Sequence, residues 1–215
     1  MKLYYHPGSA PLIAHIILEE LGVPYERVLV DRAAGEHKGD AFLRLNPNGT
    51  FPVLVDGDLV LYETAAICLH LADTHPQARL APAPGSPQRA HLYKWLAWLT
   101  NTVQAALMLY FYPERWVDDG NTDGAAQIRQ HAQDKVTGLM RQLDDELARH
   151  GGPWVLGADY SLLDPYAFVM GRWTRGFSAT PARELPHLGP FLARMLERPA
   201  VRRALANEEL APPWV

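Results

Sequence analysis

Residues 3–11, LYYHPGSAP, contain a short apolar strand and then a serine at the start of a helix. A second stretch, LNPNGTFPVL at 45–54, holds a proline whose neighbours can offer free backbone groups. It is followed by YETAAI at 62–67, in which an acidic residue and a threonine begin another helix. Hydroxyls, carboxylates and free N–H groups at helix starts suit the binding of a small charged molecule.

Around these segments, residues 1–76 alternate short apolar strands with amphipathic helices. The pattern predicts strands at 2–5, 25–30, 51–55 and 59–62, and helices at 11–21, closed by Gly22, and 64–72. Asp56-Gly57-Asp58 is a hairpin signal between the last two strands. This order, with one parallel crossover and one antiparallel hairpin, predicts an α/β domain of the thioredoxin-like kind.

The chain changes character after residue 76. A proline-rich linker is predicted at 77–87, and beyond it the strand signals vanish. Apolar residues then recur at the spacing of one helix face, as in Val136, Leu139, Met140, Leu143 and Leu147. We therefore expect 88–215 to form an all-α helical bundle domain. Ser161 and Asp164 resemble a capping box, for which a folding role is expected.

Composition excludes several partners and compartments. The chain of 215 residues has a net charge of −4 and no run rich in lysine and arginine, so neither nucleic acid nor an anionic membrane is expected as a partner. No signal peptide is expected, and no segment approaches the roughly 20 apolar residues of a membrane span. The single cysteine, Cys68, lies in an apolar helical run. It predicts a buried, inert thiol in a protein of the reducing cytoplasm.

At these spacings the chain resembles a cytosolic glutathione S-transferase, and its opening is most similar to the serine-using theta and delta classes. The resemblance covers nearly the whole chain, with its specific motifs in the first 70 or so residues. It implies a glutathione-binding domain at 1–76, glutathione as co-substrate, no metal, and a homodimer. The helical domain at 88–215 would contribute the site for a hydrophobic electrophile.

The predicted catalytic group is the hydroxyl of Ser9. A free thiol has a pKa near 8.5, so only about 3% is thiolate at pH 7. Ser9 follows a strand and precedes a helix, so its hydroxyl and the helix start could both stabilise a thiolate. The resemblance assigns the same role to Ser9, with Tyr5 as the rival donor. Ser9 could instead be only a cap or turn residue. Beta-class relatives carry cysteine where this chain has Ala10, which rules out mixed-disulfide chemistry at that position.

The other predicted glutathione contacts come from the second motif. By resemblance Pro52 is expected to be cis, which would turn the N–H and C=O of Phe51 towards the cysteinyl residue of glutathione. A trans proline that opens an edge strand is the alternative. Glu63 would take the α-ammonium and Thr64 the γ-glutamyl carboxylate, although both residue types also favour a helix start.

The glycyl carboxylate of glutathione needs a cation or another donor. His37 aligns with a delta-class histidine, with Lys38 as the nearest substitute, and a plain surface role is the alternative. Where delta relatives have a second histidine, this chain has Gly49. The sequence therefore predicts that this second contact is missing.

An aromatic wall for the second substrate is expected from Tyr110, Phe111, Tyr112, Trp116, Trp173 and Trp214, most of which could equally be core. The predicted function is transfer of glutathione to an apolar electrophile. Two alternatives remain at this point: a glutathione-dependent disulfide reductase or isomerase on the same fold, and a non-catalytic ligand-binding module.

Overall fold

The structure is a computed structural model that describes all residues from 1 to 215. The chain divides into two compact units. The first, unit 1, comprises residues 1–81 and 196–212, and the second, unit 2, comprises 82–195 and 213–215. None of the helices combines the length and the apolar character that a membrane span requires.

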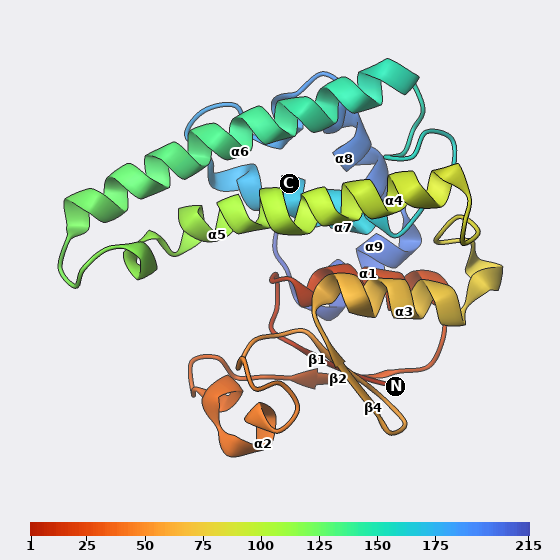
Figure 1. Cartoon of the computed structure of the whole chain (residues 1–215), viewed down its shortest axis with the longest axis horizontal. Helices are drawn as coiled ribbons and strands as arrows, with labels where there is room; N and C mark the ends of the chain where they lie inside the picture. Colours follow the sequence, from red (N-terminus) through yellow and green to blue (C-terminus); the bar gives the residue numbers. More distant parts are fainter. The chain divides into compact units, whose positions relative to one another are not determined.

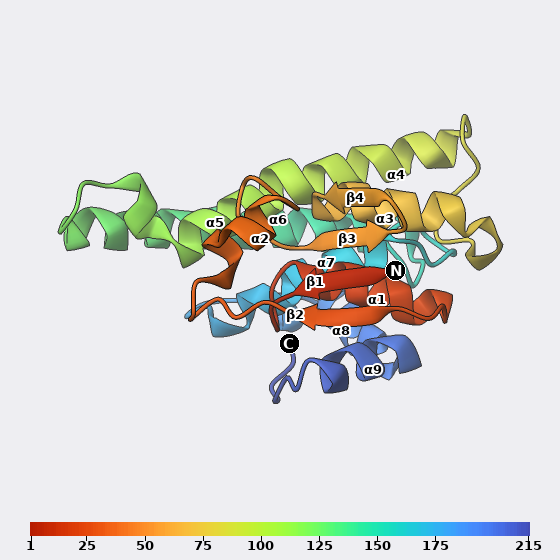
Figure 2. The same ribbon diagram turned by 90° about the horizontal axis from the view of Figure 1, so that it is seen from below.

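Unit 1 is built on a four-stranded mixed sheet with the order β2-β1-β3-β4 (Figure 2). Its strands are β1 (Lys2–Tyr5), β2 (Glu26–Leu29), β3 (Val53–Asp56) and β4 (Leu59–Tyr62). β1 and β2 are parallel, whereas β1 with β3 and β3 with β4 are antiparallel. The predicted crossover and hairpin are thus both present, and the thioredoxin-like topology is confirmed.

Two helices cover one face of this sheet, α1 (Pro11–Leu21) and α3 (Thr64–Thr74) (Figure 1). α1 has proline in its first turn and ends at Gly22, whose φ of 64° is the left-handed conformation that glycine adopts without strain. Its residues from Pro11 to Leu18 are all buried. The shorter elements of the unit are η1 (Glu36–Lys38), α2 (Asp40–Leu43) and η2 (Pro76–Ala78).

A further helix of unit 1, α9 (Pro199–Asn207), packs against α1 although it is distant in sequence. No element was predicted over these residues. The local pattern carries an amphipathic face, with Ala200, Val201, Ala204 and Leu205 buried. Its partner could not be read from the sequence, because the contact joins segments almost 190 residues apart.

Unit 2 is helical. One nearly continuous rod consists of α4 (Pro87–Trp98), a π-helical segment η3 (Leu99–Gln104) and α5 (Ala105–Phe111). The long helix α6 (Thr122–His150) packs along α5. α7 (Leu163–Trp173) forms the centre, since all of its residues are buried. The unit also contains η4 (Pro113–Trp116), η5 (Thr174–Gly176), η6 (Ala182–Glu184) and most of α8 (Leu188–Glu197).

The predicted capping pair lies at the start of α7. Asp164 accepts hydrogen bonds from the backbone N–H of Ser161 at 2.7 Å and of Val155 at 2.8 Å. The Ser161 hydroxyl accepts from the Leu163 N–H at 3.3 Å, although the capping position itself is Leu162. Both side chains therefore fasten the loop to the helix start, which is a folding role.

Candidate functional site

The loops that carry the predicted site residues lie at one edge of the unit 1 sheet. Strand pairing sets Tyr5 opposite Leu29, and Val53 opposite both Tyr4 and Tyr62. The segments that follow β1, β2 and β4 and the segment that precedes β3 consequently leave the sheet at the same edge (Figure 2). These four segments contain Ser9, His37, Glu63 and Phe51 respectively.

Ser9 lies in the turn between β1 and α1. Its hydroxyl donates to the His6 carbonyl oxygen at 2.6 Å, and its backbone N–H lies 3.4 Å from the same oxygen. The capping residue of α1 is Ala10, with no side-chain cap, so the Ser9 hydroxyl does not cap the helix. That hydroxyl would reach a ligand by rotating away from the His6 carbonyl. Its predicted role as thiolate donor stays a prediction.

Tyr5, the rival donor, is the last residue of β1 and is only 8% exposed. Its ring packs edge-on against His15, with ring centroids 6.2 Å apart, and the Arg27 guanidinium lies 6.0 Å from the ring centre. The environment is that of a packed side chain inside unit 1, and the role of Tyr5 as the rival donor stays a prediction.

The peptide bond between Phe51 and Pro52 is cis, as the resemblance implied. The N–H and C=O of Phe51 make no hydrogen bond within the chain, which leaves them available to a ligand that adds a short strand. The Phe51 ring lies between two histidine rings, with centroids 5.6 Å from His6 and 6.1 Å from His37.

Glu63 and Thr64 form the junction between β4 and α3. Glu63 has φ 71° and ψ 114°, a conformation that non-glycine residues rarely adopt. Such a backbone costs of order 1–3 kcal/mol, and residues held in this way cluster at functional sites. The Glu63 side chain is exposed and caps nothing, whereas Thr64 is buried. An exposed acid beside a helix start fits the capture of a ligand that carries both an ammonium and a carboxylate.

His37 lies in η1, next to the Phe51 ring. Burial, together with the positive charges of Lys38 and Arg32, holds the pKa of His37 below its ordinary value. At neutral pH the ring is therefore uncharged. It offers a hydrogen-bond donor to a carboxylate rather than a full positive charge.

Gly49 is required by the packing of this loop. Its φ is 60°, and a side-chain Cβ there would lie 2.8 Å from the Lys38 amine and 2.9 Å from the His37 carbonyl oxygen. The His37 carbonyl is the fixed obstacle to a side chain at this position, because the Lys38 amine ends a flexible side chain. This gives a physical reason for the glycine, and it places the cationic Lys38 amine close to Gly49.

Two features of the site were not singled out from the sequence. His6 contributes its carbonyl to Ser9 and its ring to Phe51, and its Nδ1 is buried without a partner. Its place inside the first motif was the available clue. Glu208, whose carboxylate accepts the Gly8 N–H at 2.8 Å, is 200 positions away along the chain, so no local pattern could have identified it.

Unit 2 holds most of the predicted aromatic wall. Phe111 contacts Tyr110 and Trp173, with ring centroids 5.2 and 5.8 Å apart, and Tyr110 lies 4.6 Å from Phe177. Tyr112 lies 6.4 Å from Phe111 at the edge of this group, and Trp116 is 63% exposed. No group of three or more metal-ligating side chains is present in the chain.

The chain is similar in sequence to proteins of one known family. Residues 1–73 match the family described as "Glutathione S-transferase, N-terminal domain". The chain is 30% identical over 212 residues to glutathione S-transferase GstA of Escherichia coli O157:H7, covering 98% of this chain and 100% of that protein.

Solved structures agree with this relationship. A sphingomonad glutathione S-transferase complexed with glutathione superposes with a TM-score of 0.83 at 34% identity, covering 98% of this chain and 100% of that one. The beta-class glutathione S-transferase of Sphingomonas chungbukensis does so with a TM-score of 0.84 at 34% identity and the same coverage. Because the likeness in sequence runs along almost the full length of both chains, this protein belongs to the glutathione S-transferase family.

Proposed function

We propose that this protein transfers glutathione to an apolar electrophile, with the Ser9 hydroxyl holding the thiolate. The observation that carries the proposal is the convergence on one sheet edge of Ser9, the free backbone groups of Phe51, and the Glu63–Thr64 helix start. Each polar or charged group of glutathione then has a predicted partner of suitable chemistry. The relative that was solved with glutathione bound supports the choice of ligand.

The roles follow from the chemistry of each group. Phe51 pairs through its backbone with the cysteinyl residue, Glu63 takes the α-ammonium, and Thr64 takes the γ-glutamyl carboxylate. His37 donates to the glycyl carboxylate as a neutral ring, and Lys38 adds a charge beside it. These contacts fix the sulfur near the Ser9 hydroxyl and the start of α1, where both favour the anion.

The reaction requires only the thiolate and a good leaving group. The thiol proton passes to solvent, and the sulfur lone pair forms a carbon–sulfur bond. The bond from that carbon to the leaving group breaks, and the group departs with the electron pair. A hydrogen bond to a charged group is worth roughly 1.5–3 kcal/mol, or about 1–2 pKa units. The Ser9 hydroxyl gives up its bond to the His6 carbonyl, so the lower end of that range is expected.

The electrophile is proposed to bind the aromatic group of unit 2 around Phe111 and Tyr110. Glutathione-dependent disulfide chemistry with a protein thiol is disfavoured, because Cys68 is fully buried and burial raises the pKa of its thiol. Assembly as a homodimer and residence in the cytoplasm are proposed from the family resemblance. Light scattering of the purified protein tests the first.

The decisive experiment is a pH titration of thiolate absorbance for bound glutathione, in the native protein and in Ser9→Ala. The proposal expects a thiol pKa well below that of free glutathione, returning towards it in the variant. A depressed value that survives the substitution would move the role to Tyr5 or to backbone donors. No depression in the native protein would overturn the transferase proposal.

A further inference from the structure

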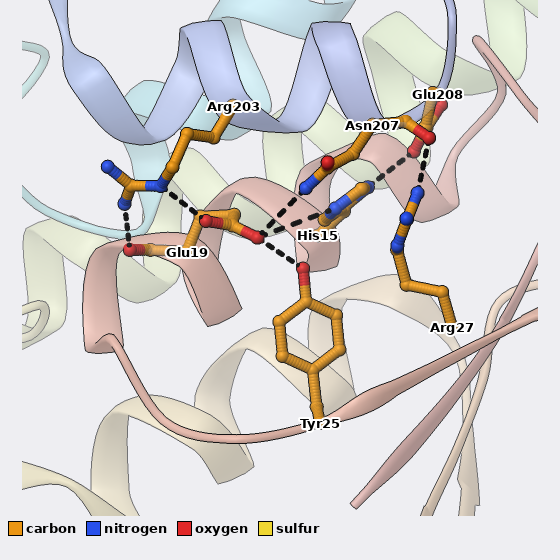
Figure 3. Close-up of polar contacts among 7 residues, drawn as sticks. All are labelled: His15, Glu19, Tyr25, Arg27, Arg203, Asn207 and Glu208. Atoms are coloured by element: carbon orange, nitrogen blue, oxygen red, sulfur yellow. Dashed lines mark hydrogen bonds and ion pairs between the residues drawn. The ribbon is translucent and has the colours of Figure 1, made fainter.

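A buried carboxylate joins the segment after α9 to the turn that carries Ser9. Glu208 directly follows α9, and its side chain has no exposed surface. One oxygen lies 2.8 Å from Nδ1 of His15, a side chain that is also fully buried, and the other accepts the Gly8 N–H at 2.8 Å (Figure 3 shows the pair with His15). A carboxylate inside a protein is tolerated only when its oxygens are hydrogen bonded. Here each oxygen has a polar partner.

Two ion pairs join α1 to α9 and to the residue that precedes α9. Arg203 lies 2.6 Å from the Glu19 carboxylate, and Arg198 lies 2.6 Å from that of Glu20. Tyr25 also donates to Glu19, at 2.6 Å (Figure 3). The two ion pairs dock α9 on α1, yet neither of them touches the turn before Ser9. Glu208 makes that contact through its carboxylate.

The conformation of the turn that Glu208 contacts depends on the orientation of one peptide group. His6 to Ser9 form a turn with proline second and glycine third, and Gly8 has φ 69°. This is the pattern of a type II turn, which differs from type I by a flip of the central peptide. That peptide here joins Pro7 to Gly8, and its N–H is the group that donates to Glu208.

We propose that Glu208 is a positioning residue for Ser9: it locks the Pro7–Gly8 peptide in the orientation from which the serine hydroxyl reaches the glutathione sulfur once it rotates away from the His6 carbonyl. The inference rests on the proposed function, since it concerns the serine that the function requires. Without the acceptor the central peptide loses the hydrogen bond that favours this orientation. The Ser9 backbone and its hydroxyl would then leave the productive geometry.

Four variants separate the geometry of this contact from its charge and from helix docking. Glu208→Gln has a side chain of the same length and keeps an acceptor oxygen. Glu208→Asp keeps the charge, but its side chain is shorter by one methylene. Glu209→Asp makes the same chemical change one residue later, at an exposed side chain. Arg203→Ala weakens the docking of α9 without touching the turn. Circular dichroism and thermal melting show whether each variant is folded.

The readout is the thiol pKa of bound glutathione, measured also in the Ser9→Ala background. Glu208→Asp should raise that pKa by at least half of the rise caused by Ser9→Ala. Glu208→Gln, Glu209→Asp and Arg203→Ala should leave it near the native value. In the Ser9→Ala background, Glu208→Asp should cause no additional rise, because it acts through the serine.

Several outcomes would overturn the inference. A native thiol pKa in folded Glu208→Asp would do so, as would a rise of equal size in Arg203→Ala, which would assign the effect to docking. A full additional rise in the Ser9→Ala background would show that Glu208 acts independently of Ser9. If Ser9→Ala raises the thiol pKa and Glu208→Asp does not, the inference fails and the proposed function stands. If the native protein shows no depressed thiol pKa, the proposed function itself fails.

Discussion

At the scale of single residues, the site depends on backbone positions that few side chains tolerate. Glu63 has a strained backbone conformation at the start of α3. Gly49 has a left-handed backbone conformation and lies next to Lys38. Such positions persist only where the surrounding structure enforces them. Each of the two therefore allows a substitution whose effect is specific.

Glu63→Gln should raise the KM for glutathione about tenfold with little change in kcat, because it removes roughly 1.4 kcal/mol of attraction for the α-ammonium in the ground state and transition state alike. Steady-state kinetics with varied glutathione measures this. With a glutathione analogue that lacks the amino group, native and variant enzymes should have the same KM. An equal rise in KM for glutathione and for the analogue would contradict the role assigned to Glu63.

Gly49→Ala should lower the free energy of unfolding by more than Gly57→Ala, the matched control. Both glycines have φ 60°, so both substitutions cost about 1–2 kcal/mol for the left-handed backbone. Nothing lies within 4 Å of a side chain at Gly57, whereas one at Gly49 meets Lys38 and His37. Displacement of these neighbours adds about 1–3 kcal/mol to the loss of unfolding free energy in Gly49→Ala. Urea unfolding measures the difference between the two variants. Equal losses would show that the loop yields freely.

At the scale of elements, local patterns predicted unit 1 well where strand, turn and helix follow one another closely. The strand at 2–5, the helix at 11–21 with its glycine end, and the hairpin at Asp56–Asp58 all form as expected. The helix α9 was missed, because its amphipathic face says nothing about its partner. The folding role of Ser161 and Asp164 was predictable from their three-residue spacing, although the capping residue of α7 is Leu162 and not Ser161.

The predicted site residues illustrate the same limit. The chemistry of Ser9, Phe51 and Glu63 could be inferred because their motifs are contiguous. The contact of Glu208 with Gly8 could not, since it depends on how α9 docks. The reason for a glycine at position 49 also required the structure, because residues 37 and 38 fill the space that a side chain there would occupy.

The docking of α9 should weaken in acid. Burial opposes ionisation of Glu19, but hydrogen bonds from Tyr25 and Arg203 and the charge of Arg203 outweigh it, so the pKa of Glu19 lies below its ordinary value. A carboxyl with a lowered pKa stabilises the folded state above its unfolded pKa of about 4.3, and this contribution is lost as the pH falls through the folded value. Glu19→Gln should thus cost about 1 kcal/mol at pH 7 and much less at pH 3.

Urea unfolding at the two pH values tests this expectation. Glu209→Gln is the matched control, because Glu209 is exposed and makes no ion pair. Its effect should be small at both pH values. A loss for Glu19→Gln that is as large at pH 3 as at pH 7 would show that the stabilisation is not electrostatic.

At the scale of the whole molecule, unit 1 is discontinuous in sequence: residues 196–212 complete a body begun by residues 1–81. A fragment of residues 1–81 would leave one face of α1 in water and Glu19 and Glu20 without their arginines. This fragment should show no cooperative thermal transition by circular dichroism. Addition of a peptide of residues 196–212 should restore one, whereas the same peptide with Arg198 and Arg203 changed to alanine should not. A cooperative transition in the fragment alone would contradict this expectation.

The discontinuity of unit 1 also sets an order of events during synthesis on the ribosome. Residues 1–81 emerge first, but Glu208 follows about 130 residues after residue 81. At 5–20 residues per second this leaves a delay of roughly 6–25 s. If Glu208 orients Ser9 as proposed, a nascent or prematurely terminated chain would display the thiol-binding loops without an aligned hydroxyl. Activation of glutathione would then be confined to polypeptides whose translation had passed residue 208.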